Sequence, residues 1–178
     1  DTPITYCSSQ GNNYSYEWIS NVQFGSYSNT SGAAGYTDFT SESVEMEAGS
    51  NISVSLSPGF SGSTYTEYWK VWIDFNHDNV FQDPGELVVN RVLTAPPAGT
   101  TTATVKATFK LPASALSGST CMRVSMKRQA NPSPCETLAF GEVEDYTVII
   151  VEQKPDNDLS ARATGISFEA FRVQTRVQ

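Results

Sequence analysis

A two-residue alternation of apolar and polar side chains recurs along this chain and constrains its fold more than any other feature. Residues 103–110 read Ala-Thr-Val-Lys-Ala-Thr-Phe-Lys, so every second side chain is apolar. Successive side chains of an extended strand point to opposite faces, so such a run buries one face and exposes the other. Helix signals are weak, and only residues 112–116, which begin with a proline, suit a single helical turn.

About eight apolar runs of this kind are separated by clusters of turn-forming residues. They lie at residues 18–24, 44–46, 52–56, 65–73, 87–93, 103–109, 121–126 and 143–151. Residues 1–17 are expected to form an irregular lead-in, and the glycine- and serine-rich residues 25–35 a loop. Many short strands with turns between them predict an all-β fold, an antiparallel β-sandwich or a jelly-roll-like variant of it.

The 178 residues are enough for one full domain with a sizeable core. We assign this domain to residues 1–152. Around residues 152–160 the composition becomes charged and polar and includes Pro155, which is typical of a linker. For residues 153–178, a linker and tail, three readings stay open: an extra strand, the start of another domain, or a frayed end.

The charge of the chain bears on its partners. Its formal net charge is −8 at pH 7, which predicts repulsion from nucleic acids and anionic membranes. No apolar run approaches the ~18 residues of a membrane span. Because Asp1 is not a translation start, we read the beginning as a mature or excised terminus and expect a secreted, extracellular protein.

A cluster of oxygen-bearing residues follows the run at 65–73. The expected ligands are the side chains of Asp74, Asn76, Asp78, Asp83 and Glu86 and the backbone carbonyl of Val80. Calcium takes six to eight oxygen ligands, and alternate residues of a loop can point at one ion. The pattern differs from an EF-hand because its twelfth position is Gly85 and a strand leads in. The alternative is a polar hairpin loop, since turns favour Asp and Asn anyway.

The cysteines predict one disulfide. The three cysteines have no zinc-type spacing, and the chain has one histidine, His77, which we expect to be solvated. Cys121 begins a strand that rises ~3.3 Å per residue, and Cys135 lies beyond its far end, whereas a bridge needs Cα atoms within ~7 Å. We therefore expect a Cys7–Cys135 bridge that ties the lead-in to the sandwich and leaves Cys121 free.

Tyrosine and tryptophan side chains are the candidates for ligand binding. Sugar rings stack their C–H faces on aromatic planes, and exposed tyrosines in polar loops suit this contact. The candidates are Tyr14, Tyr16 and Tyr27 in expected loops, and Tyr68 and Trp72 on the second face of the run at 65–73. The alternative, which applies most to Trp72, is that a central strand buries both of its faces.

Catalytic constellations are missing from the sequence. A single histidine, no serine elbow and no zinc ligand set exclude the usual hydrolase sites. Paired carboxylates can hydrolyse glycosides, but among 19 acidic residues chance pairs are certain. We therefore predict that this chain is not an enzyme.

Several motifs, taken in order, resemble the GEVED domain family. They are Tyr6-Cys7, Trp18-Ile-Ser-Asn-Val22, Val71-Trp-Ile-Asp-Phe-Asn76, Met122-Arg-Val124, Pro134-Cys135 and Phe140-Gly-Glu-Val-Glu-Asp-Tyr-Thr-Val148. The resemblance covers residues 6 to about 151. It implies a β-sandwich accessory module of secreted bacterial hydrolases, including metalloproteases and polysaccharide-degrading enzymes, and of adhesins. It implies no single ligand, and Cys121 departs from the ordinary strand residue expected there.

The acidic signature of this family carries no obvious chemistry. On a strand, Glu142 and Glu144 share one face with Tyr146, while Val143 and Asp145 share the other. We expect Arg123 on the preceding strand to pair with Glu142 or Glu144. The alternative is that one of these acids completes the calcium shell.

Two functions from different classes fit these observations. The first is a carbohydrate-binding module that holds a parent catalytic domain on polysaccharide, with calcium in its loop. The second is a structural spacer or a protein-binding or adhesion domain of a secreted protease or surface protein.

Overall fold

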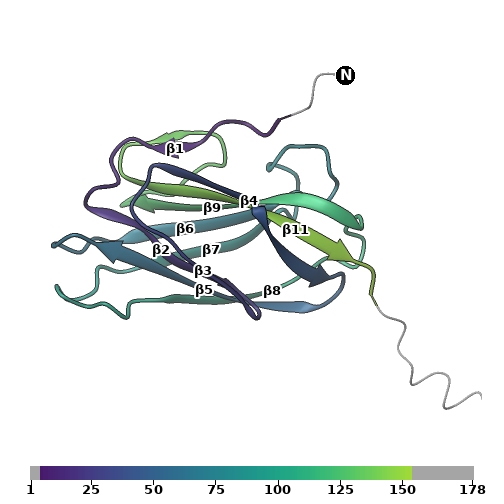
Figure 1. The fold of residues 1–178 in the computed structure, drawn as a ribbon, viewed down its shortest axis with the longest axis horizontal. Helices are drawn as coiled ribbons and strands as arrows, with labels where there is room; N and C mark the ends of the chain where they lie inside the picture. Colours follow the sequence, from purple (N-terminus) through teal and green to yellow (C-terminus); the bar gives the residue numbers. More distant parts are fainter. Residues whose placement is uncertain (1–4, 154–178) are drawn as a thin grey trace, which may run out of the picture.

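The computed structural model describes residues 5–153, and all regular secondary structure in this range is β-strand (Figure 1). The strands are β1 (Gln10–Gly11), β2 (Glu17–Phe24), β3 (Tyr27–Thr30), β4 (Tyr36–Glu47), β5 (Asn51–Phe60), β6 (Glu67–Ile73), β7 (Leu87–Leu93), β8 (Val105–Lys110), β9 (Gly118–Arg128), β10 (Thr137–Leu138) and β11 (Gly141–Val151). Residues 112–116 form no helix; turns occupy part of this stretch.

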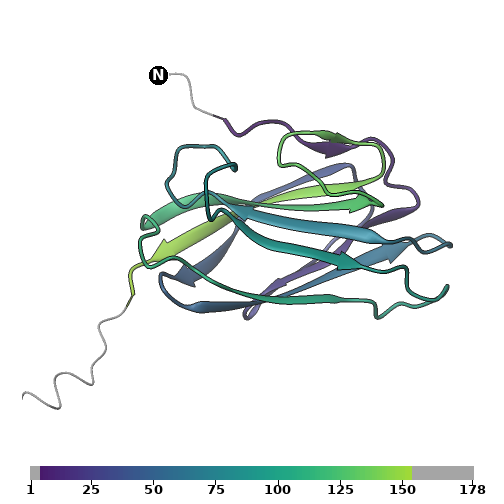
Figure 2. The same cartoon turned by 180° about the vertical axis from the view of Figure 1, so that it is seen from behind.

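Two sheets face each other and form a β-sandwich (Figures 1 and 2). One has five strands in the order β4-β11-β9-β6-β7, and the other has four in the order β3-β2-β5-β8. Every pairing within these two sheets is antiparallel except that of β11 with β4. The predicted all-β sandwich is confirmed.

The core lies between the two sheets and follows the predicted alternation. On β6, Trp69, Val71 and Ile73 are fully buried. On β9, Met122 and Val124 are also fully buried and belong to the same cluster. Burying one such side chain contributes roughly 1.5–3 kcal/mol, so this strip of β6 and β9 holds the two sheets together.

The structure has three short strands that the sequence did not predict. β3 lies inside the expected loop at 25–35 and pairs with β2. β1 lies inside the expected lead-in and pairs with β10. β4 is also longer than its two apolar residues suggested, since it begins at Tyr36 and its first half is largely exposed. β1, β3 and β10 have two to four residues each, which is too short to show an alternation, and the first half of β4 has no fully buried side chain.

The chain from residue 5 to β1 crosses the outer face of the five-stranded sheet (Figure 1). The predicted disulfide, Cys7–Cys135, is confirmed and joins Cα atoms 5.5 Å apart across 128 residues of sequence. Cys121 is free, as predicted, and it is buried. The bridge therefore fixes an otherwise irregular segment against the sandwich.

The tail of the chain lies mostly outside this description. Apart from residue 153 itself, the predicted linker and tail at 153–178 lie outside the described residues. Among the residues that are described, no helix has the length and apolar character needed to cross a membrane.

Candidate functional site

The predicted calcium loop connects β6 to β7 and brings three carboxylates together. Oxygens of Asp74, Asp78 and Glu86 all lie within 4.8 Å of one another. Asp74 is fully buried and Glu86 is 2% exposed, whereas Asp78 is exposed. Asp74 follows the last residue of β6 and Glu86 precedes the first residue of β7, so the two strands position the buried pair.

Short-range hydrogen bonds shape the loop. The two carboxylate oxygens of Asp74 accept from the backbone N–H groups of Asp78 at 3.2 Å and Asn79 at 2.9 Å. His77 and Asn79 have φ values of 60° and 67°, in the left-handed region that Asn tolerates better than most residues. The local sequence therefore folds the chain tightly around the Asp74 carboxylate.

The other predicted ligands lie at the exposed side of this loop. The side-chain amide of Asn76 donates to Asp83 at 2.6 Å and to Asp78 at 3.1 Å. Val80 contacts Asp78 through its backbone N–H, which donates to the carboxylate at 2.9 Å. The predicted metal ligands of this loop are all oxygen atoms, which suits a hard cation such as calcium.

The electrostatics of the loop also favour a cation. Burial raises the pKa of Glu86 to about 7, although backbone N–H donors from Asp83 and Phe75 oppose the rise. The negative charges of Asp74 and Asp83 raise it further. Within the described residues, both salt bridges lie elsewhere, at Arg123–Asp145 and Lys127–Glu136. No side-chain cation therefore neutralises the carboxylates of the loop.

Tyr6 connects this loop to the lead-in, a link that the sequence did not predict. Its hydroxyl donates to the Asp74 carboxylate at 2.6 Å, and its ring stacks on Phe81 with centroids 4.7 Å apart. Thr120 on β9 donates to the Asp74 carbonyl at 2.6 Å. Asp74 is thus held from two segments distant in sequence.

The acidic signature behaves differently from the expectation. Arg123 forms its salt bridge with Asp145, at 2.6 Å and 2.7 Å, and not with Glu142 or Glu144. Asp145 is the register partner of Arg123 across β9 and β11, so their side chains share the outer face of the sheet. Glu142 and Glu144 must then point to the opposite face.

The two signature glutamates make contacts between the sheets rather than at the calcium loop. Glu142 accepts from the backbone N–H of Ile19 on β2 at 2.8 Å, and Glu144 accepts from the Ser31 hydroxyl at 2.6 Å. Burial raises the pKa of Glu142 to about 8 and that of Glu144 to about 6. These carboxyls join the two sheets of the sandwich.

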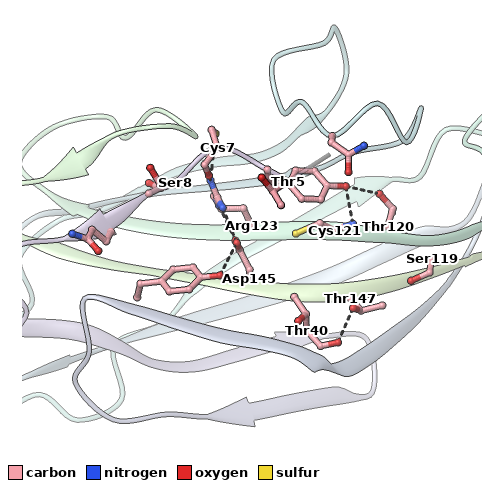
Figure 3. Close-up of a pocket in the computed structure, with 15 residues that line it drawn as sticks. Thr5, Cys7, Ser8, Thr40, Ser119, Thr120, Cys121, Arg123, Asp145 and Thr147 are labelled. Carbon is pink, nitrogen blue, oxygen red and sulfur yellow. Dashed lines mark hydrogen bonds and ion pairs between the residues drawn. The ribbon is translucent and has the colours of Figure 1, made fainter. Parts of the chain in front are cut away.

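A cavity of about 600 Å³ lies next to the loop, between the lead-in and the outer face of the five-stranded sheet (Figure 3). Its lining is rich in hydroxyl-bearing side chains and includes Asn79 of the loop and Tyr36 of β4. The free thiol of Cys121 also lines it, and burial raises the pKa of that thiol well above its usual value. The thiol therefore stays protonated and unreactive near neutral pH.

The candidate aromatic residues are in different environments. Tyr14 and Tyr16 lie in the loop before β2 and are 40% and 47% exposed. Tyr27 lies in β3 rather than in a loop and packs edge-on against Tyr146. Tyr68 is half-buried on β6. Trp72 is 3% exposed and packs with Phe81 and Cys121, as the alternative of a strand buried on both faces expected.

Comparison with known families bears out the resemblance. Residues 68–149 match the GEVED domain. The match begins in β6 and ends in β11, so it contains the loop at 74–86, Arg123 and the acidic signature. A search of curated proteins gave no match.

Proposed function

We propose that this chain is a non-catalytic, calcium-binding module that holds a secreted bacterial enzyme on polysaccharide, and the match of residues 68–149 to the GEVED domain supports the accessory role. The observation that carries the proposal is the pair of exposed tyrosines in the loop before β2. Tyr14 and Tyr16 are 40% and 47% exposed, and among the described residues Tyr36 is the one other aromatic side chain with comparable exposure. Exposed aromatic side chains mark recognition surfaces more often than structural ones.

Both tyrosines are held in place, which favours a binding role. The Tyr14 ring lies against Gly35, where an added Cβ would come within 3.2 Å of it. Tyr16 lies beside Phe140, with ring centroids 6.3 Å apart. A ring that is already fixed loses little conformational entropy when a ligand stacks on it, so more of the contact energy appears as affinity.

Calcium would have a structural role in this proposal. Asp74, Asp78 and Glu86 would hold the ion, with Asn76, Asp83 and the Val80 carbonyl as further donors. An ion that binds only the folded state stabilises it by about 2.7 kcal/mol at a hundredfold excess over its dissociation constant. Here it would neutralise carboxylates whose buried members, Asp74 and Glu86, have no cationic side-chain partner among the described residues.

The disulfide supports the proposed location. Disulfides form and persist in oxidising surroundings such as the bacterial periplasm and the extracellular space. The Cys7–Cys135 bridge therefore suits a secreted protein.

Retention on insoluble and immobilised polysaccharides tests the proposed function. We expect the calcium-loaded chain to be retained by at least one polysaccharide, and the Tyr14→Ala and Tyr16→Ala variants to be retained less at an unchanged melting temperature. Val92→Ala, which truncates another exposed side chain on β7, serves as the matched control. A folded chain that no polysaccharide of a broad panel retains would replace this proposal with a spacer or protein-binding domain.

A further inference from the structure

The cavity beside the calcium loop has walls from segments that are fixed independently. The lead-in forms one wall, strands β4, β9 and β11 form the floor, and Asn79 contributes from the loop. The disulfide at Cys7 and hydrogen bonds of 2.7 Å from Arg123 to the carbonyls of Cys7 and Pro134 hold the lead-in over the sheet. The cavity is therefore a preformed feature of the sandwich, and its volume of about 600 Å³ suits a small ligand.

Four neutral polar side chains in the lining of this cavity are free to bind a ligand. The side chains of Ser8, Gln10, Asn79 and Ser119 line it, and none of them has a hydrogen-bond partner among the described residues. Hydroxyl and amide groups both donate and accept hydrogen bonds. This is the combination that a ligand carrying several hydroxyl groups would satisfy.

Within the described part of the chain, the floor of the cavity offers no free positive charge. Arg123 is the one cationic side chain among the described residues that line it. Its guanidinium donates to both oxygens of Asp145 and to two backbone carbonyls, as part of this network in Figure 3 shows. A sulfate or carboxylate group would find no cation to pair with and would meet a chain of net charge −8. The cavity therefore selects against anionic ligands.

An aromatic ring stands at the edge of the same cavity. Tyr36 is 41% exposed, and its hydroxyl donates to Asp145 at 3.1 Å, which fixes the ring. Tyr14 lies against Gly35, the residue before Tyr36. Tyr14 therefore lies close to the chain segment that carries Tyr36 at the edge of the cavity.

From these observations we infer that the cavity is a subsite for one sugar unit of a neutral, unsulfated glycan, with Tyr36 stacking on the sugar and Ser8, Asn79 and Ser119 bonding its hydroxyls. The inference rests on the proposed polysaccharide-binding function and assigns it a second, more selective contact. Calcium would act on this subsite, because Asn79 and the Tyr6–Asp74 hydrogen bond belong to the ion loop. Affinity for the sugar should then rise when calcium fixes the loop.

Filling the cavity tests the inference in the full chain. Ser119 is exposed on β9, so Ser119→Phe places a ring in the cavity without disturbing the core. Thr108→Phe, at an exposed position of β8 in the other sheet, is the matched control. Titrations would use cello-, xylo-, manno- and malto-oligosaccharides as neutral probes, and polygalacturonate and dextran sulfate as anionic ones, with calcium and with chelator.

We expect one neutral oligosaccharide series to bind, Ser119→Phe to weaken it at least about tenfold, Thr108→Phe to leave it unchanged, and chelator to weaken it in the wild type. Full affinity in a folded Ser119→Phe variant, with loss in Tyr14→Ala, would overturn the subsite and leave the proposed function standing. Binding of anionic probes alone would do the same. An affinity that chelator does not change would overturn the coupling to calcium. If no probe binds the wild type, both the subsite and the polysaccharide function are wrong.

Discussion

Two glutamate side chains are buried inside the sandwich, close enough for their charges to interact. Glu17 on β2 and Glu67 on β6 are both fully buried. None of their four carboxylate oxygens has a hydrogen-bond partner among the described residues. Burial raises the pKa of Glu67 to about 8, the charge of Glu17 raises it further, and Arg128 opposes the rise. The pKa of Glu17 is also raised by burial.

Replacing Glu67 with Gln should therefore stabilise the fold at high pH. A carboxyl whose pKa is raised on folding stabilises the folded state fully below its unfolded pKa, and this contribution is lost as the pH rises through the folded value. For Glu67 the window runs from 4.5 to about 8. At about 1.4 kcal/mol per pKa unit this corresponds to at most ~5 kcal/mol. Because the charge of Glu17 is coupled to that of Glu67 and Arg128 opposes the rise, we expect a gain of roughly 2–3 kcal/mol above pH 8.

Urea unfolding at a series of pH values from 4 to 9, with calcium kept saturating, measures this gain. The free energies of unfolding of wild type and Glu67→Gln should converge near pH 4 and separate as the pH rises. Glu45→Gln, at an exposed position of β4, should follow the wild type throughout. A Glu67→Gln variant that is less stable at every pH would refute the reasoning, because it would mean that the wild-type carboxylate is charged and has a partner.

Three further predictions concern the loop, the disulfide and the buried ion pair. Chelator should lower the melting temperature of the wild type but not of Asp74→Asn, and an unchanged wild-type value would rule out a stabilising ion. Replacing Cys7 and Cys135 with Ser should cost about 2–5 kcal/mol in urea unfolding, and a smaller loss would mean that the lead-in contributes little to stability. Arg123→Met leaves the buried Asp145 carboxylate without a partner and should lower the free energy of unfolding by about 3–5 kcal/mol. The double variant Arg123→Met with Asp145→Leu should recover most of this lost stability. If it does not, the uncompensated charge is not the cause of the loss.

The parts of the fold that could be predicted are those with a local cause. Alternation within β6, β8, β9 and β11 follows from which residues face the core, and the tight loop after Asp74 follows from Asp and Asn at turn positions. The partner of Arg123 could not be predicted in the same way. Which of residues 142–146 share a face of the sheet follows from their alternation along the strand. The register that sets Asp145 opposite Arg123 depends instead on how the two strands pair. The cavity is still further from prediction, because its lining comes from five separate parts of the chain: residues 5–10, 36 and 40, 79, 119–121 and 123, and 145 and 147.

The family signature can be explained by packing at the start of β11. Gly141 has a φ of 124°, a region that side chains disfavour. A Cβ at this position would collide with the Met126 carbonyl of β9, and a Cβ on Gly11 would collide with the Gly141 carbonyl. Glycine is thus required where three backbone segments meet, which brings β1 close to the start of β11.

The acidic residues of the signature connect the two sheets and the lead-in. Glu142 and Glu144 face inward, to Ile19 in β2 and to Ser31 directly after β3 of the other sheet. Asp145 faces outward and holds Arg123, which in turn holds the carbonyl of Cys7. The inward-facing glutamates of β11 therefore contact the four-stranded sheet, and its outward-facing Asp145 holds the lead-in through Arg123. A strand with this role accounts for the acidic signature by packing, because its carboxyl groups accept from the backbone N–H of Ile19, the hydroxyl of Ser31 and the guanidinium of Arg123.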